Sequence, residues 1–186
     1  MTGDHPRSRP APSRPAPPRP APEGRLPGER VVVNRQRAVA VRPRLLLTFL
    51  TRACELVLPR AAGVAVCLVS DAEIARLNRT YRGKGGATDV LSFPATDRNG
   101  GAGAGGAAAT LGLAGLKAGS TFHLGDIAIS PAAARRNART LGRSVPEELR
   151  VLILHGVLHL AGYDHETDQG EMERRELRLR RRLGIG

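Results

Sequence analysis

Residues 155–165 read His155-Gly-Val-Leu-His159-Leu-Ala-Gly-Tyr-Asp-His165, and they hold three of the five histidines in this 186-residue chain. His155 and His159 are four residues apart, so on a helix they share one face and can approach a single ion. Gly162 can adopt the left-handed conformation that ends a helix, and the following turn can bring His165 back as a third ligand. Three imidazoles with an open fourth position are typical of a catalytic zinc ion, which lowers the pKa of a bound water to about 7.

Two histidines at helical spacing can also belong to an ordinary solvated helix face. Here, however, the residues that precede them are mostly apolar, as in a buried helix: Leu149, Val151, Leu152, Ile153 and Leu154. Unpaired imidazoles beside such a surface would cost desolvation free energy that a bound metal removes. The pattern therefore favours a metal site, and we expect one zinc ion per chain.

The same spacing occurs in the metzincin proteases, whose motif is H-E-x-x-H-x-x-G-x-x-H. All three histidines and Gly162 match this motif, but Gly156 stands where those enzymes carry a glutamate that acts as general base. Glycine has no side chain that could take a proton from water. The segment is therefore similar to a zincin metal site without a peptidase's base, which weighs against proteolysis.

The length and composition indicate one domain with an aliphatic core. Hydrophobic residues make up 41% of the chain, but there is no Trp and aromatic residues are only 3%. Cys54 and Cys67 have apolar neighbours and no metal-ligand spacing, so we interpret them as reduced core residues of a cytoplasmic protein rather than as a disulfide. The sequence contains neither a signal-peptide pattern nor an apolar run of membrane-spanning length, and no membrane partner is expected.

The net charge of +12 favours a polyanionic partner. Residues 1–29 contain five Arg and three acidic residues, so most of the positive charge belongs to the rest of the chain. Six arginines gather near the C-terminus: Arg174, Arg175, Arg178, Arg180, Arg181 and Arg182. A solvated helix face that aids solubility explains this cluster equally well. Beside a hydrolytic metal site, a basic surface favours nucleic acid.

Local signals predict a single α+β domain, in which a small mixed sheet packs with helices and carries the zincin-like site on a helix and its following turn. Strands are expected at residues 31–33, 63–69, 88–93 and 123–129. Helices are expected at residues 42–58, 70–81 and 131–141, from residue 144 through the histidine pair, and at 168–183. Ser70, Ser144 and Asp168 each precede a glutamate by three residues, and we expect them to cap their helices.

Two segments lack the pattern of a packed element. Residues 1–29 are rich in Pro, Arg and Ala and are predicted to be a disordered tail, with an arm that touches RNA as the alternative. Residues 96–120 form a Gly/Ala-rich insert in the domain of residues 30–186. This insert has too many glycines for a stable helix and is predicted to be a long mobile loop.

Three stretches together resemble the YbeY family, the zinc-dependent endoribonucleases of bacterial ribosomal RNA maturation. They are Asn78-Arg-Thr-Tyr-Arg-Gly-Lys-Gly-Gly-Ala-Thr-Asp-Val-Leu-Ser-Phe-Pro94, Leu124-Gly-Asp-Ile-Ala-Ile-Ser130 and the histidine segment. Their order and spacing match over about residues 31–183, and nothing is carried over to the tail or the insert.

The resemblance implies that His155, His159 and His165 bind zinc and that Arg82 is the basic residue of the catalytic cavity. A guanidinium can hold a phosphate through two hydrogen bonds and stabilise the charge that develops during phosphodiester cleavage. The activity implied is that of a single-strand-specific endoribonuclease, which hydrolyses phosphodiesters with a zinc-bound water in ribosomal RNA maturation. The implied partners are ribosomal RNA and the ribosome or its small subunit.

Other polar residues near these motifs receive structural interpretations. Lys84 can help to hold phosphate or can belong to a plain flexible turn. Asp89 and Asp126 are expected at turns, at sheet ends or behind the metal ligands, and His123 is expected to be structural. Asp164 is expected to form a local turn or a hydrogen bond behind the ligands.

Two other functions remain open at this point. The first is a zinc metallopeptidase, which the zincin spacing supports and Gly156 opposes. The second is a non-catalytic ribosome-assembly factor with a structural zinc, which would require a fourth protein ligand because structural zinc sites are closed. The general base, and the choice between water and the 2′-hydroxyl as nucleophile, cannot be assigned from the residues.

Overall fold

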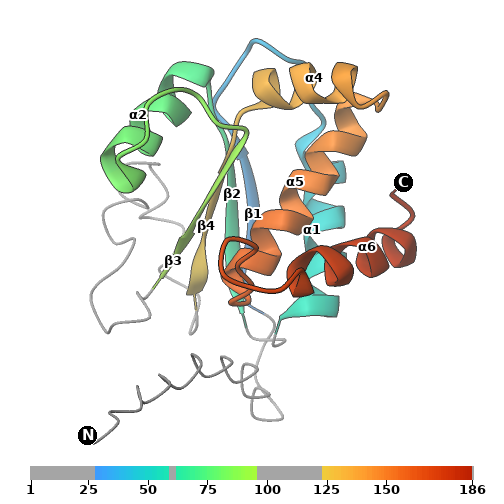
Figure 1. Cartoon of the computed structure of the whole chain (residues 1–186). Helices are drawn as coiled ribbons and strands as arrows, with labels where there is room; N and C mark the ends of the chain where they lie inside the picture. Colours follow the sequence, from blue (N-terminus) through green and yellow to red (C-terminus); the bar gives the residue numbers. More distant parts are fainter. Residues whose placement is uncertain (1–27, 59–61, 96–122, 186) are drawn as a thin grey trace, which may run out of the picture.

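The computed structural model describes residues 28–58, 62–95 and 123–185 (Figure 1). Nearly all of the predicted tail at 1–29 and all of the predicted loop at 96–120 lie outside these ranges, so both remain predictions. Within the described ranges, no helix combines the length and apolar character needed to cross a membrane.

One four-stranded mixed sheet, with strand order β1-β2-β4-β3, forms the centre of the fold. β1 pairs in parallel with β2, β2 pairs in parallel with β4, and β3 is antiparallel to β4. The prediction of a small mixed sheet is confirmed, and β3 is one of its two edge strands. The strands are β1 (Arg30–Asn34), β2 (Gly63–Leu68), β3 (Val90–Pro94) and β4 (His123–Ile129).

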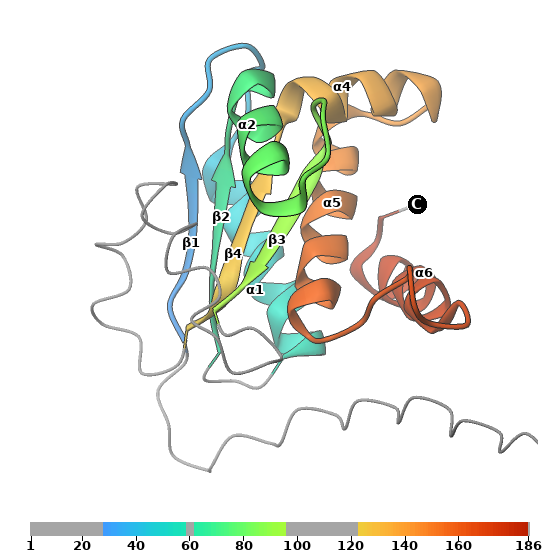
Figure 2. The same cartoon turned by 60° about the vertical axis from the view of Figure 1, so that its left-hand side comes forward.

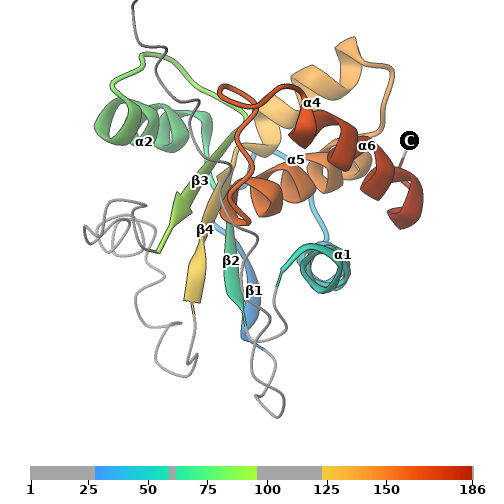
Figure 3. The same cartoon turned by 60° about the horizontal axis from the view of Figure 1, so that its bottom comes forward.

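Helices cover both faces of this sheet, as Figures 1 and 3 show. On one side, α1 and α5 pack against the strands, and α6 lies across both helices. On the other side, α2 packs against the sheet (Figure 2). α4 leads from the end of β4 into α5 and packs against it. The helices in the described ranges are α1 (Pro43–Val57), α2 (Asp71–Arg82), α4 (Pro131–Thr140), α5 (Val145–Leu160) and α6 (Glu171–Leu183).

The hydrophobic core is divided by the sheet and is almost wholly aliphatic, as the composition predicts. The larger part lies under α1, α5 and α6, and the smaller part lies under α2. Burying a single Leu or Ile side chain contributes about 1.5–3 kcal/mol, so these two layers supply most of the stabilising free energy. Cys54 and Cys67 are buried and free of disulfides, and burial raises the pKa of each thiol to about 11.

Helix capping follows the predicted register at two of the three expected positions. The hydroxyl of Ser70 accepts the N–H of Glu73 at 3.2 Å, and the hydroxyl of Ser144 accepts that of Glu147 at 3.3 Å. The third prediction places the start of the helix too early, because α6 begins after Gly170, which has a φ of 78°. The carboxylate of Asp168 accepts the N–H of Gly170 at 2.7 Å in a local turn, and its other oxygen accepts the N–H of Met172, in the first turn of α6, at 2.8 Å.

Gly156 lies where α5 crosses β4, and it allows the helix to approach the sheet closely. A Cβ atom at this position would lie 2.8 Å from Cγ2 and 2.9 Å from Cδ1 of the fully buried Ile127. Real Cβ atoms essentially never come so close to a neighbour. A glutamate at position 156 would therefore begin with its side chain directed into β4, so the absence of the peptidase base has a cause in packing.

This contact predicts that Gly156→Ala destabilises the protein. Overpacking costs about 1–3 kcal/mol, whereas the better helix propensity of Ala returns about 1 kcal/mol, so we expect a net loss of up to about 2 kcal/mol. Thermal unfolding of the variant would measure the loss. Gly85→Ala is the matched control, because a Cβ there meets nothing within 4 Å. Adding Ile127→Val should recover part of the loss, and an unchanged unfolding temperature in Gly156→Ala would contradict the prediction.

Candidate metal centre

The C-terminal end of α5 and the loop after it bring the three histidines together. His155 and His159 lie on the last turns of α5, and Gly162, with a φ of 95°, turns the chain just after the helix. The N–H of Tyr163 returns to the carbonyl of Leu158 at 3.1 Å, which closes the turn. One ring nitrogen from each of the three histidines then lies within 4.8 Å of the others.

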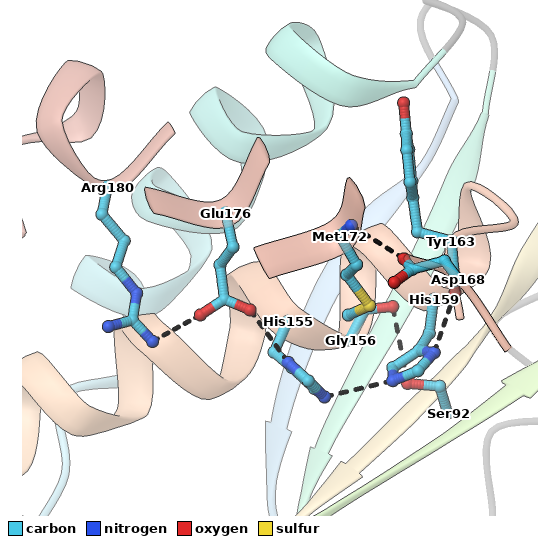
Figure 4. Close-up of polar contacts among 9 residues, drawn as sticks. All are labelled: Ser92, His155, Gly156, His159, Tyr163, Asp168, Met172, Glu176 and Arg180. Carbon is cyan, nitrogen blue, oxygen red and sulfur yellow. Dashed lines mark hydrogen bonds and ion pairs between the residues drawn. The ribbon is translucent and has the colours of Figure 1, made fainter. Parts of the chain in front are cut away.

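Hydrogen bonds fix the orientation of two of the rings (Figure 4). Nδ1 of His155 lies 2.9 Å from Oε2 of Glu176, and Nδ1 of His159 lies 3.0 Å from the carbonyl oxygen of Tyr163. Both partners are acceptors, so each Nδ1 carries the ring proton and each Nε2 presents a lone pair. The two Nε2 atoms face each other at 3.1 Å.

Two lone pairs at this distance repel each other unless a cation lies between or beside them. Protonation of His159 is disfavoured, because burial, together with the positive charge that His155 and His165 would carry, lowers its pKa to about 4. The ring is therefore neutral at neutral pH, which is the form that binds metals. The donor set fits a zinc ion, since neutral imidazole nitrogens are among its preferred ligands.

The cluster of three histidines is exposed on one side. His155 and His159 are partly buried, whereas His165 is exposed. Across the described residues, no further His, Cys, Asp or Glu joins the three in a metal-binding group. A site with three protein ligands and a solvent-facing side has the arrangement of a catalytic rather than a structural zinc site.

Two basic side chains, one at the end of α2 and one just after it, lie beside the loop that carries His165. Nη2 of Arg82 is 3.5 Å from Oε1 of Glu166, and Nζ of Lys84 is 3.7 Å from the same oxygen. All three side chains are about half exposed or more, so these ion pairs contribute little to stability and can exchange partners at small cost. The structure thus brings Arg82 to the residue next to His165, although its role in catalysis remains a prediction.

Asp164 and Asp89 form the local turns expected from the sequence, whereas Asp126 lies in the interior of β4 and not at a turn or a sheet end. Asp164 accepts the N–H of Glu166 at 3.1 Å in a local turn. Asp89 lies at the start of β3, where its carboxylate accepts the N–H of Val90 at 2.8 Å. On β4, Nε2 of His123 lies 2.9 Å from Oδ1 of the fully buried Asp126.

Sequence reasoning missed Glu176, which it left within an arginine-rich helix that could be a solvated face. The residue lies in the middle of the buried side of α6, between Met172 and the pair Leu179 and Leu183. An acidic residue within an apolar stripe of helical spacing was the available signal. Burial raises the pKa of Glu176, but the hydrogen bond from His155 and the charge of Arg180 outweigh this effect and hold the pKa below its usual value.

Comparison with known proteins agrees with this geometry. The family model described as endoribonuclease YbeY matches residues 32–184. A protein of Koribacter versatilis named endoribonuclease YbeY is 43% identical over 159 residues, which cover 83% of this chain and 86% of the relative. One of the same name from Nautilia profundicola is 40% identical over 122 residues, covering 66% and 73%.

A solved structure has a similar fold. The solution structure of TM1509 from Thermotoga maritima has a TM-score of 0.50 and 26% sequence identity to this chain, and the match covers 83% of this chain and 88% of that one. The resemblance carried by the three sequence stretches is therefore confirmed, and the chain belongs to the endoribonuclease YbeY family.

Proposed function

We propose that the protein is a zinc-dependent endoribonuclease that cleaves single-stranded RNA in the maturation of ribosomal RNA. The observation that carries this proposal is the pair of imidazoles whose Nε2 atoms face each other at 3.1 Å, with the exposed His165 beside them. Membership of the endoribonuclease YbeY family supports RNA as the substrate.

Several residues of the chain would have separate roles in phosphodiester hydrolysis at this centre. His155, His159 and His165 would hold zinc, which acts as a Lewis acid and lowers the pKa of a water that it binds to about 7, providing a nucleophile for phosphodiester hydrolysis. Arg82 would leave Glu166 and hold a phosphate oxygen pair through its guanidinium, stabilising the charge that develops on the phosphate. Lys84 would add a second positive charge at the same place.

The two alternative functions fit the described residues less well. A peptidase of zincin type needs a carboxylate at position 156, where a side chain would collide with Ile127. An assembly factor with a structural zinc needs a fourth protein ligand, and the group of possible ligands in the described ranges stops at three. Both arguments favour a hydrolytic site that works without a glutamate next to His155.

The proposed setting is the cytoplasm, with ribosomal RNA presented by the ribosome or its small subunit. The net charge of +12 supports a polyanionic partner. The two buried cysteines, both free of disulfides, are those expected of a protein from a reducing compartment.

The first prediction from this proposal concerns metal content. The purified protein should contain about one zinc per chain, and His155→Ala or His159→Ala should lose most of it, because two imidazoles bind far more weakly than three. Elemental analysis after gel filtration would measure the zinc. His123→Gln is the control, since this histidine lies outside the group and its amide can still donate to Asp126. Full zinc retention in both alanine variants would remove the metal centre from the proposal.

The second prediction concerns RNA cleavage and Arg82. Arg82→Ala should lower the cleavage rate of a single-stranded RNA roughly 100-fold, as the loss of one donor to a developing oxyanion does, while the zinc content stays unchanged. Arg82→Lys should recover only part of the rate, because an ammonium keeps the charge but not the planar two-point contact.

The control for this experiment is Arg79→Ala. Arg79 lies one turn earlier on α2 and is also exposed, but it makes no ion pair with Glu166 in the described residues. RNA binding by the wild type should also weaken steeply as salt is added. A wild type that leaves RNA whole, cuts a generic peptide and is indifferent to Arg82→Ala would overturn the proposed function.

A further inference from the structure

We infer that Glu176 is a positioning residue of the metal centre, which orients His155 from α6 so that its Nε2 faces the bound metal. This inference rests on the proposed metal-dependent function and extends the centre to a helix that supplies none of its histidines.

The contact between α6 and His155 is close and well shielded from water. Oε2 of Glu176 lies 2.9 Å from Nδ1 of His155, and the other oxygen, Oε1, contacts the guanidinium of Arg180 (Figure 4). The side chain of Glu176 is 12% exposed and that of Arg180 is 18% exposed. Each oxygen therefore has its own partner, and Arg180 prevents the carboxylate from turning away from the histidine.

A carboxylate in this place does more to His155 than hold it in the fold. By accepting the Nδ1 proton, it selects the tautomer whose lone pair is on Nε2, and it makes the ring a stronger electron donor to a metal. His159 has only the neutral carbonyl oxygen of Tyr163 behind its Nδ1. The two histidines of α5 are thus held by acceptors of different strength, and His155 receives the charged one.

The attachment of α6 explains how the carboxylate is delivered accurately. Met172, Leu179 and Leu183 are buried in the main core, and Glu176 lies between them on the same side of the helix. Because apolar side chains before and after Glu176 pack into the core, they fix the position of its carboxylate along the axis of α5. The last helix is therefore a component of the metal centre and not only a cover for the core.

The test compares zinc affinity in Glu176→Gln with that in the wild type. Chelator competition should show zinc binding weakened about 10- to 100-fold, the effect expected when the hydrogen-bond partner of a metal-binding histidine loses its charge. The absorption spectrum of the cobalt-substituted protein should shift as well, because the ligand field of His155 changes. Glu173→Gln is the matched control, since Glu173 lies on the same helix and is exposed.

Unfolding of the metal-free proteins separates positioning from general stabilisation. Glu176→Gln keeps an amide oxygen for Arg180, so its metal-free unfolding temperature should stay close to that of the wild type. If this variant fails to fold, the double variant Glu176→Gln with Arg180→Met should fold, because it leaves no buried unpaired charge. Its zinc affinity should be lower than that of the wild type, as in the single variant.

The two proposals fail in different ways. A wild type that neither binds zinc nor cleaves RNA would overturn the proposed function. A wild type that binds zinc, together with a folded Glu176→Gln variant of equal zinc affinity and unchanged cobalt spectrum, would overturn the role of Glu176 alone.

Discussion

The close approach of α5 to β4 is the constraint on which the rest of the molecule depends. It exists because position 156 has no side chain and Ile127 fills the space. The same helix carries the largest share of the buried core and, on its last two turns, His155 and His159. The packing of the core therefore also determines where the two histidines lie. A change that moves α5 away from the sheet would move both imidazoles with it.

Electrostatics at the centre follow from this packing. A helix pressed onto the sheet places His159 where burial opposes protonation, so the ring stays neutral and available to a metal. The charged side chains around the histidines fall into two sets, one shielded from solvent and one exposed to it. Glu176 and Arg180 are shielded and well placed to hold a ring in position, whereas Arg82, Lys84 and Glu166 are exposed and can change partners. A shielded side and an exchangeable side are what the proposed metal-dependent nuclease would need in order to keep its metal and release its product.

Much of the fold could be predicted from local sequence signals. Ser70 and Ser144 cap their helices because a serine three residues before a glutamate is a short-range pattern that needs no tertiary information. The histidine segment is similarly local, since helical spacing and one glycine account for its geometry. The start of α6 was placed too early because the carboxylate of Asp168 also makes a local turn with Gly170 before it accepts the N–H of Met172 in the helix.

The contacts that cross the molecule could not be found in this way. The proximity of Arg82 to the loop after α5 depends on how α2 and α5 pack at the edge of the sheet, since Arg82 and Glu166 are far apart in the sequence. The apolar stripe of α6 places Glu176 on the buried side of the helix, but only the docking of α6 shows that its carboxylate meets His155. Spacing along the chain carries no information about either docking geometry.

The position of α6 after the histidines has a consequence for biosynthesis. A growing chain contains His155, His159 and His165 before it contains Glu176, because synthesis runs from the N-terminus. The three histidines can thus emerge while the ring of His155 still lacks its carboxylate partner, and that partner arrives only once α6 has folded back onto α5. The hydrogen bond between His155 and Glu176 is therefore made only after the three histidines have been synthesised.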